Sequence, residues 1–142
     1  MKLDANDPIG QQILERLQHE QVIWLVTTSS DGTPQPRPVW FWWNGETFLI
    51  YSQPTAYKVR HIARSPRVAL NFNSTPDGDD VVIFTGTAHI ESTPVPAAEH
   101  ASYLAKYAAG IPIIGMTPES YSARFSTVIR VTPEKVRGVD VL

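Results

Sequence analysis

The chain has 142 residues, a size typical of one domain, and no linker-like stretch divides it, so we expect a single domain over residues 1–142. It has no cysteine, which excludes disulfides, thiolate nucleophiles, thiolate zinc sites and iron–sulfur clusters. The formal net charge is −2, whereas duplex DNA binders usually carry an excess of basic residues, so we expect no nucleic-acid partner. The sequence shows neither a long apolar run nor a secretory signal, so we expect a cytoplasmic protein without a membrane partner.

The first elements are a helix and a buried strand. Asp7-Pro8 begins a helix predicted to run to about Gln18, because aspartate caps helix N-termini and proline suits the first helical position. The β-branched and aromatic run 22–29 predicts a buried strand, which ends at turn residues 30–33.

The next predicted strand, residues 36–43, carries two signals about its neighbours. Pro36 and Pro38 cannot donate ladder hydrogen bonds, which places part of this strand at a sheet edge. Asn44-Gly45 is a strong hairpin signal, so we expect residues 47–52 to return antiparallel to it.

The remaining elements complete a mainly β pattern. Thr55 is expected to cap a short helix, and Gly86 predicts a bulge or a close approach within a long strand. The pattern predicts helices over 56–64, 96–107 and about 118–124, a loop over 110–115, and strands over 67–73, 81–91 and 125–132, the last extended over 135–139. This order favours an α+β fold, mainly β: a small antiparallel barrel of about six strands with a few flanking helices.

Several catalytic and metal-binding motifs are excluded by missing residues. Residues 110–117 have the glycine spacing of a phosphate-binding P-loop, but Met116 stands where the lysine is needed. No Gly-x-Gly-x-x-Gly or Gly-x-Ser-x-Gly motif is present. We predict no metal site, because the four histidines have no tight mutual spacing: His19, His61, His89 and His100.

Residues 37–67 hold five of the twelve basic residues, interleaved with hydroxyl side chains. Lys58 falls in the first turn of a predicted helix, where free backbone N–H groups and the helix dipole attract anions. A phosphate there would meet amides, hydroxyls and a lysine together; the alternative is a solvated basic helix face. The residues are Arg37, Lys58, Arg60, Arg64 and Arg67, with Tyr51, Ser52, Thr55 and Tyr57.

Residues 40–43 read Trp-Phe-Trp-Trp and lie just before the predicted hairpin. Because side chains alternate along a strand, these four rings cannot all face one core. Some must face solvent, a partner chain or a planar ligand. Both a core or dimer contact and a stacked ligand therefore stay open.

Three ordered segments together resemble the split-barrel flavin-binding family, which includes pyridoxamine 5′-phosphate oxidase and small flavin or deazaflavin (F-420) reductases. They are Arg37-Pro38-Val39-Trp40-Phe41, Tyr51-Ser52-Gln53-Pro54-Thr55-Ala56-Tyr57-Lys58 and Ser65-Pro66-Arg67-Val68-Ala69-Leu70. The resemblance implies a six-stranded antiparallel split β-barrel and a homodimer. Each cofactor site would be built from both subunits, with residues 81–86 of the partner chain near the cofactor.

The resemblance also implies roles for single residues. By position, the cofactor-binding residues would be Arg37, Pro38, Val39 and Trp40 along the ring and ribityl chain, and Tyr51, Ser52, Thr55, Lys58 and Arg60 around the phosphate. The oxidases carry Ser-Arg-Lys where this chain has Ala56-Tyr57-Lys58, and a lysine near the position of Trp42. We therefore do not expect pyridoxamine phosphate oxidation itself.

The predicted function is that of an oxidoreductase, in which FMN or the deazaflavin coenzyme F-420 transfers hydride to a small unsaturated molecule. The basic cluster favours the deazaflavin, because its tail is longer and more acidic. No catalytic residue is assigned: Tyr51, Tyr57 and His89 are proton-donor candidates by type only, and water is another donor. Two other classes stay open, a flavin- or haem-binding carrier without turnover and an interaction module whose aromatic cluster is a dimer contact.

Overall fold

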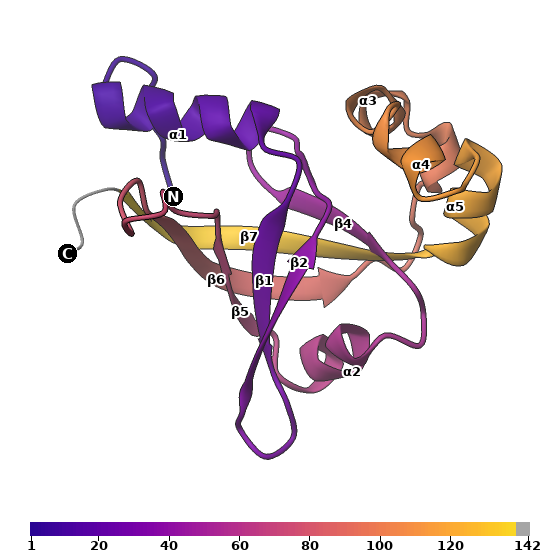
Figure 1. Ribbon diagram of the computed structural model, residues 1–142. Coiled ribbons are helices and arrows are strands. Elements are labelled where there is room, and N and C mark those ends of the chain that lie inside the picture. The colour runs from indigo at the N-terminus through magenta and orange to yellow at the C-terminus, as the bar shows by residue number, and fades with distance from the viewer. Residues whose placement is uncertain (139–142) are drawn as a thin grey trace.

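The computed structural model describes residues 1–138, and its strands form one sheet flanked by helices (Figure 1). In chain order the elements are α1 (Pro8–His19), β1 (Ile23–Thr28), β2 (Pro34–Val39), β3 (Trp42–Trp43), β4 (Phe48–Ser52), α2 (Tyr57–Arg64), β5 (Arg67–Asn71), β6 (Val82–Ile90), the 3₁₀ turn η1 (Ala97–Glu99), α3 (Ala101–Lys106), α4 (Gly110–Ile113), α5 (Pro118–Arg124) and β7 (Thr127–Gly138). Val139, the last residue of the predicted extension, lies outside the described residues. Within residues 1–138, no helix is long and apolar enough to cross a membrane.

The sheet has seven strands in the order β2-β1-β5-β6-β7-β4-β3, and every neighbouring pair is antiparallel. It curls into a half-barrel, which confirms the predicted split-barrel fold. The edge position predicted from Pro36 and Pro38 is also confirmed, because β2 pairs only with β1 and is the last strand on its side. The β1–β2 hairpin projects from the body of the molecule (Figure 1).

The strand count differs from the expected six because the predicted strand 36–43 is interrupted. Its first part, β2, pairs back onto β1, whereas its last two residues, β3, pair with β4 across the predicted Asn44-Gly45 hairpin. Trp40 and Phe41 lie between the two strands. The chain therefore crosses from one edge of the sheet to the other at these two residues.

The close approach predicted at Gly86 is confirmed. The β6–β7 register shifts between Thr85 and Gly86, which is a β-bulge. A Cβ atom on Gly86 would lie 2.1 Å from the carbonyl oxygen of Thr132. Only glycine fits there, because the obstructing atom belongs to the backbone of β7.

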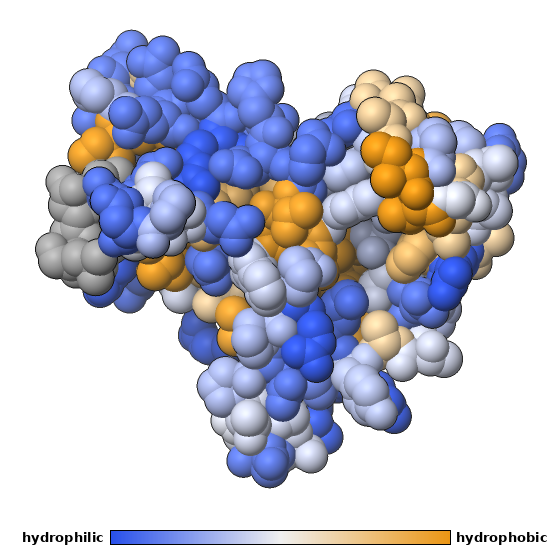
Figure 2. Space-filling model, viewed as in Figure 1, coloured by the Kyte–Doolittle hydropathy of each residue, from blue (hydrophilic) through white to orange (hydrophobic). Residues whose placement is uncertain are grey.

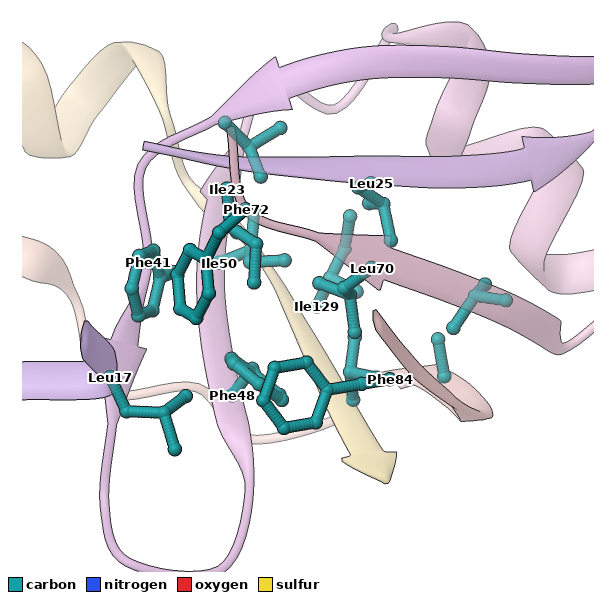
Figure 3. Packing of buried hydrophobic residues seen from close by; sticks show 14 of the residues in the cluster. Leu17, Ile23, Leu25, Phe41, Phe48, Ile50, Leu70, Phe72, Phe84 and Ile129 are labelled. Carbon is teal, nitrogen blue, oxygen red and sulfur yellow. The ribbon is translucent and has the colours of Figure 1, made fainter. Parts of the chain in front are cut away.

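The barrel core contains a closed ring of phenylalanine contacts (Figure 3). Phe41 and Phe84 each contact both Phe48 and Phe72, with ring centroids 5.1–6.1 Å apart. The tilted and edge-to-face angles are those that aromatic pairs prefer. Leu17 places the apolar stripe of α1 against this core.

A second hydrophobic cluster joins the sheet to a helical lobe formed by η1, α3, α4 and α5. β4 is buried on both faces, since Phe48 and Ile50 enter the barrel core while Leu49 and Tyr51 enter the lobe cluster. Because both faces of this strand are covered, its sequence does not alternate apolar and polar residues. The lobe contributes Tyr103, Tyr107, Ile111 and Tyr121.

The helices of the lobe differ from the sequence expectation in two ways. The predicted helix 96–107 is broken at His100, whose Nδ1 accepts the backbone N–H of Tyr103 (3.0 Å) and so caps α3. The predicted loop 110–115 contains the short helix α4, ended by Gly115 at φ 77°. The helix predicted over 118–124 is confirmed as α5.

The N-terminal caps of α1 and α2 also differ from each other. Asp7 caps α1 as predicted, with its Oδ2 accepting the backbone N–H of Gly10 (3.2 Å). The Thr55 cap is wrong: Ala56 is the N-cap of α2, and no side chain binds the free amides there. Lys58 nevertheless lies in the first turn of α2, as predicted.

Candidate functional site

Two adjoining cavities flank the N-terminus of α2. One, of about 690 Å³, lies between α2 and the β1–β2 hairpin, and we call it the basic cavity: Thr27, Arg37, Lys58, Arg60, His61 and Arg64. The other, of about 400 Å³, lies between β2, β4 and the helical lobe, and we call it the aromatic cavity: Val39, Trp40, Tyr51, Ser52, Tyr121 and Phe125. Ala56 and Lys58 line both. The two volumes lie within the ~300–1,000 Å³ of small-molecule sites.

The basic cavity concentrates positive charge. Arg37 on β2 faces Lys58, Arg60 and Arg64 on α2 across the cavity. Burial, and then the Arg37 guanidinium, lower the pKa of the Lys58 ammonium. An anion in this cavity would relieve that repulsion and would meet the uncapped amides at the start of α2.

His61 is fixed in the wall of the basic cavity. Its Nδ1 lies 2.8 Å from the hydroxyl of Thr27, which is buried on β1. Burial, followed by the neighbouring Arg64 and Arg60, lowers the pKa of this imidazole. His61 is therefore neutral at pH 7 and adds a hydrogen-bonding group rather than another charge.

The wall of the aromatic cavity is a stack of rings. The indole of Trp40 stacks on Tyr107 with ring centroids 4.4 Å apart and planes 6° apart, and on Tyr121 at 5.6 Å. The hydroxyls of Tyr121 and Tyr103 are 2.6 Å apart. Figure 2 shows hydrophobic residues over the middle of the sheet and on the helical lobe that faces it. The cavity therefore offers a rigid, planar, apolar wall.

The structure brings together eight of the nine residues expected to bind a cofactor. Pro38, Val39, Trp40, Tyr51 and Ser52 line the aromatic cavity, Arg37 and Arg60 line the basic cavity, and Lys58 lines both. Thr55 is exposed in the turn before α2 and lines neither cavity. These residues come from β2, the break after it, β4 and α2, and they lie together along one groove.

The three proton-donor candidates have different surroundings. Tyr51 lines the aromatic cavity, but its hydroxyl donates to the carbonyl oxygen of Val95 (2.8 Å), and burial raises its pKa to about 12. Tyr57 is 70% exposed at the rim of the basic cavity. His89 lies on β6 outside both cavities, with its Nε2 3.5 Å from a Glu91 carboxylate oxygen. A role for any of them stays a prediction.

The four aromatic residues at 40–43 divide between the two hydrophobic clusters. Phe41 and Trp43 pack in or against the barrel core, whereas Trp40 and Trp42 pack against the lobe cluster. The expectation that they cannot share one core is thus confirmed. Of the four, Trp40 also lines the aromatic cavity.

Sequence reasoning missed the residues that the helical lobe supplies. Tyr121, Phe125 and Ile114 line the aromatic cavity, and His61 lines the basic cavity. The lobe residues follow Trp40 by more than seventy positions, and no spacing links them to it. His61 lies three residues after Lys58, one helical turn on, and that spacing could have placed it beside the lysine. Among residues 1–138, no group of three metal-ligating side chains is found.

The chain is similar in fold to solved structures. A search of curated proteins found no significant match. Among solved structures, a putative pyridoxamine 5′-phosphate oxidase from Listeria innocua is 25% identical, with TM-score 0.64 and coverage of 90% of this chain and 95% of that chain. An F420 reductase is 26% identical, with TM-score 0.64 and coverage of 87% and 94%.

A more distant structure shares the fold alone. It is the haem storage protein HutZ from Vibrio cholerae, 16% identical, with TM-score 0.65 and coverage of 98% of this chain and 96% of that chain. The profile of the pyridoxamine 5′-phosphate oxidase family matches residues 9–140, almost the whole sequence. The chain therefore belongs to the pyridoxamine 5′-phosphate oxidase family.

Proposed function

We propose that this protein is an oxidoreductase that binds FMN or the deazaflavin coenzyme F-420 along the groove formed by the two cavities. The observation that carries the proposal is their junction: a planar apolar wall and a cationic cavity meet at Lys58. A flavin-type cofactor has a matching division into a planar ring and an anionic tail. Family membership supports the same class of ligand.

The residues present fit such a cofactor. The ring would lie against β2 and Trp40 in the aromatic cavity, with Val39 and Tyr121 beside it. The phosphate would bind Lys58 and the free amides of α2. The bound cofactor supplies hydride transfer to a small unsaturated molecule; the protein orients the ring and excludes water from it.

The acidic tail distinguishes the two cofactors. FMN ends in one phosphate, whereas the deazaflavin coenzyme has a longer and more acidic tail. The basic cavity extends past Lys58 to Arg60 and Arg64, which would remain without an anion if only FMN were bound. This extension, together with the similarity to an F420 reductase, favours the deazaflavin.

We further propose a homodimer in which each groove is completed by the partner chain. Both cavities are open on one side in the single chain, and an exposed apolar residue, Tyr57, stands at the rim of the basic cavity. Sedimentation at micromolar concentration tests this. A monomer under those conditions would contradict the shared site.

A carrier without turnover is the second candidate. In the described part of the aromatic cavity, both tyrosine hydroxyls already have partners, Val95 for Tyr51 and Tyr103 for Tyr121. The Tyr51 hydroxyl donates its proton to Val95 and is therefore not free to give it to a substrate. Steady-state oxidation of the reduced cofactor by model acceptors separates the two candidates: turnover supports the enzyme, and tight binding without turnover supports the carrier.

The first experiment is a paired titration of purified protein with FMN and with F-420, followed by tryptophan quenching and calorimetry. Lys58→Ala should weaken binding ~10- to 100-fold, because one charge-assisted contact is lost. Lys135→Ala is the matched control, since Lys135 is exposed on β7 and lines neither cavity. If neither cofactor binds, or if Lys58→Ala binds like the control, the proposed site is misplaced.

A further inference from the structure

A third cavity, of about 460 Å³, lies apart from the groove, between the C-terminal end of α1, β3 and α3. The residues used below are Gln18, His19, Trp42, Trp43, Ser102 and Lys106. None of them lines the basic or the aromatic cavity. The proposed function therefore makes no use of this space.

Lys106 is the cation of this cavity, and its position is fixed. Its Nζ donates to the carbonyl oxygen of Phe41 (2.8 Å) and lies 3.6 Å from the centroid of the Phe41 ring. These two contacts hold the ammonium at the end of α3. An ammonium has three N–H donors, so others remain available to a ligand.

The charge of Lys106 has no close counter-ion. Among residues 1–138, no carboxylate oxygen lies within 4.0 Å of its Nζ. The nearest acidic influence is Glu20, whose carboxylate is engaged by Arg16 at 3.0 Å. Burial outweighs Glu20 and lowers the pKa of Lys106 to about 8. An anionic ligand would supply the missing counter-charge.

The other walls fit a flat ring and a carboxylate. Trp42 and Trp43 are half-buried, and each is held by a neighbour: Trp42 edge-on against His100 at 4.4 Å, Trp43 against Phe48 at 4.8 Å. Fixed indoles lose little freedom when a planar ligand packs on them. His19, Gln18 and Ser102 add hydrogen-bonding groups to the lining of the same cavity.

From this arrangement we propose that the third cavity binds an aromatic carboxylate, with Lys106 pairing with the carboxylate and Trp42 and Trp43 contacting the ring. This site is separate from the cofactor groove and does not depend on the proposed function. Phe41, whose carbonyl oxygen accepts from Lys106, precedes Trp42 and follows Trp40, which lines the aromatic cavity.

Calorimetric titration with benzoate tests the proposal. Benzamide keeps the ring without the charge, and acetate keeps the charge without the ring; both should bind at least ~10-fold more weakly than benzoate. Lys106→Met should weaken benzoate binding by ~10-fold or more. Ser102 is an exposed residue of the cavity lining, so Ser102→Phe keeps the ammonium but places a ring in the cavity. This variant should abolish benzoate binding even if Lys106→Met is poorly folded.

Lys58→Met distinguishes this site from the cofactor groove. It should leave benzoate binding unchanged while weakening FMN binding, whereas Ser102→Phe should do the reverse. The proposal is overturned if benzoate does not bind, if both cavity variants bind it like the unaltered protein, or if Lys58→Met is the variant that loses it. Failure of FMN to bind would count against the proposed function alone.

Discussion

The hydroxyl of Tyr107 lies 2.8 Å from the backbone nitrogen of Phe41 and accepts its N–H where β2 has ended and β3 has not begun. The same hydroxyl lies 2.7 Å from the carbonyl oxygen of Gln21, to which it can donate. One buried side chain from the helical lobe thus satisfies the backbone at the strand break. It also stacks on Trp40, so it links the break to the aromatic cavity.

Tyr107→Phe is expected to destabilise the protein by about 1–3 kcal/mol, because it leaves the buried N–H of Phe41 without a partner. The ring stays, so stacking on Trp40 is kept. Urea unfolding measures the change. Tyr57→Phe is the control, since that residue is 70% exposed, and it should change stability by less than about 0.5 kcal/mol. Equal effects of the two variants would contradict the assigned role.

Local signals in the sequence predicted local structure well. The proline positions of β2, the Asn44-Gly45 hairpin and the Gly86 bulge each depend on one or two residues whose backbone chemistry admits few conformations. The interruption at Phe41 was not predictable in this way. The hydroxyl that accepts the Phe41 N–H at the break comes from a residue 66 positions later, and strand patterning carries no information about such a partner.

The candidate site likewise has a part that the sequence predicted and a part that it did not. The residues on β2, β4 and α2 were found because a family resemblance and a cluster of cations mark them within a short stretch of sequence. The lobe residues that line the aromatic cavity were missed. The helices of residues 97–124 pack onto β4 through tyrosines, and in the sequence these tyrosines look the same as ordinary core residues. Thr55 was misplaced because a cap was assigned by residue type, whereas the helix begins after Ala56.

Gly86→Ala is expected to destabilise the barrel by at least about 3 kcal/mol, the upper end of overpacking effects. The added Cβ would lie 2.1 Å from the Thr132 carbonyl oxygen and 2.8 Å from the Cα of Pro133, and neither backbone atom can move without opening the β6–β7 ladder. Thermal unfolding and far-UV circular dichroism measure the loss. Thr85→Ala, an exposed change one residue earlier on β6, should have little effect. Similar melting of both variants would argue against the bulge.

Stability should rise as the pH increases from about 8 toward 10, in part through Lys106. Its pKa is about 8 in the folded protein and 10.5 in the unfolded chain, so the unfolded state binds more protons in this window and stability rises with pH. Above pH 10 the trend reverses, because buried tyrosines such as Tyr51 keep their protons in the folded state.

Urea unfolding across this pH range isolates the contribution of Lys106. The Lys106→Met variant should lose part of the rise that the unaltered protein and the surface variant Lys135→Met both retain. The pKa of the Lys58 ammonium is also lowered, so Lys58 contributes in the same direction. Part of the rise in unfolding free energy with pH should therefore remain in Lys106→Met. An unchanged slope in Lys106→Met would mean that its ammonium is solvated.

The double variant Arg60→Gln/Arg64→Gln should separate the two candidate cofactors. Both cations line the basic cavity beyond Lys58, where only the longer acidic tail of F-420 would reach them. Exposed charge pairs contribute about 0.2–1 kcal/mol each, so F-420 affinity should fall about 2- to 30-fold while FMN affinity stays within about twofold. The control is Arg67→Gln/Arg137→Gln, which removes two exposed cations from β5 and β7 outside both cavities. FMN lacks the long tail, so removing cations that contact only the tail cannot lower its affinity. Equal losses for FMN and F-420 in the first variant would therefore mean that the tail binds elsewhere.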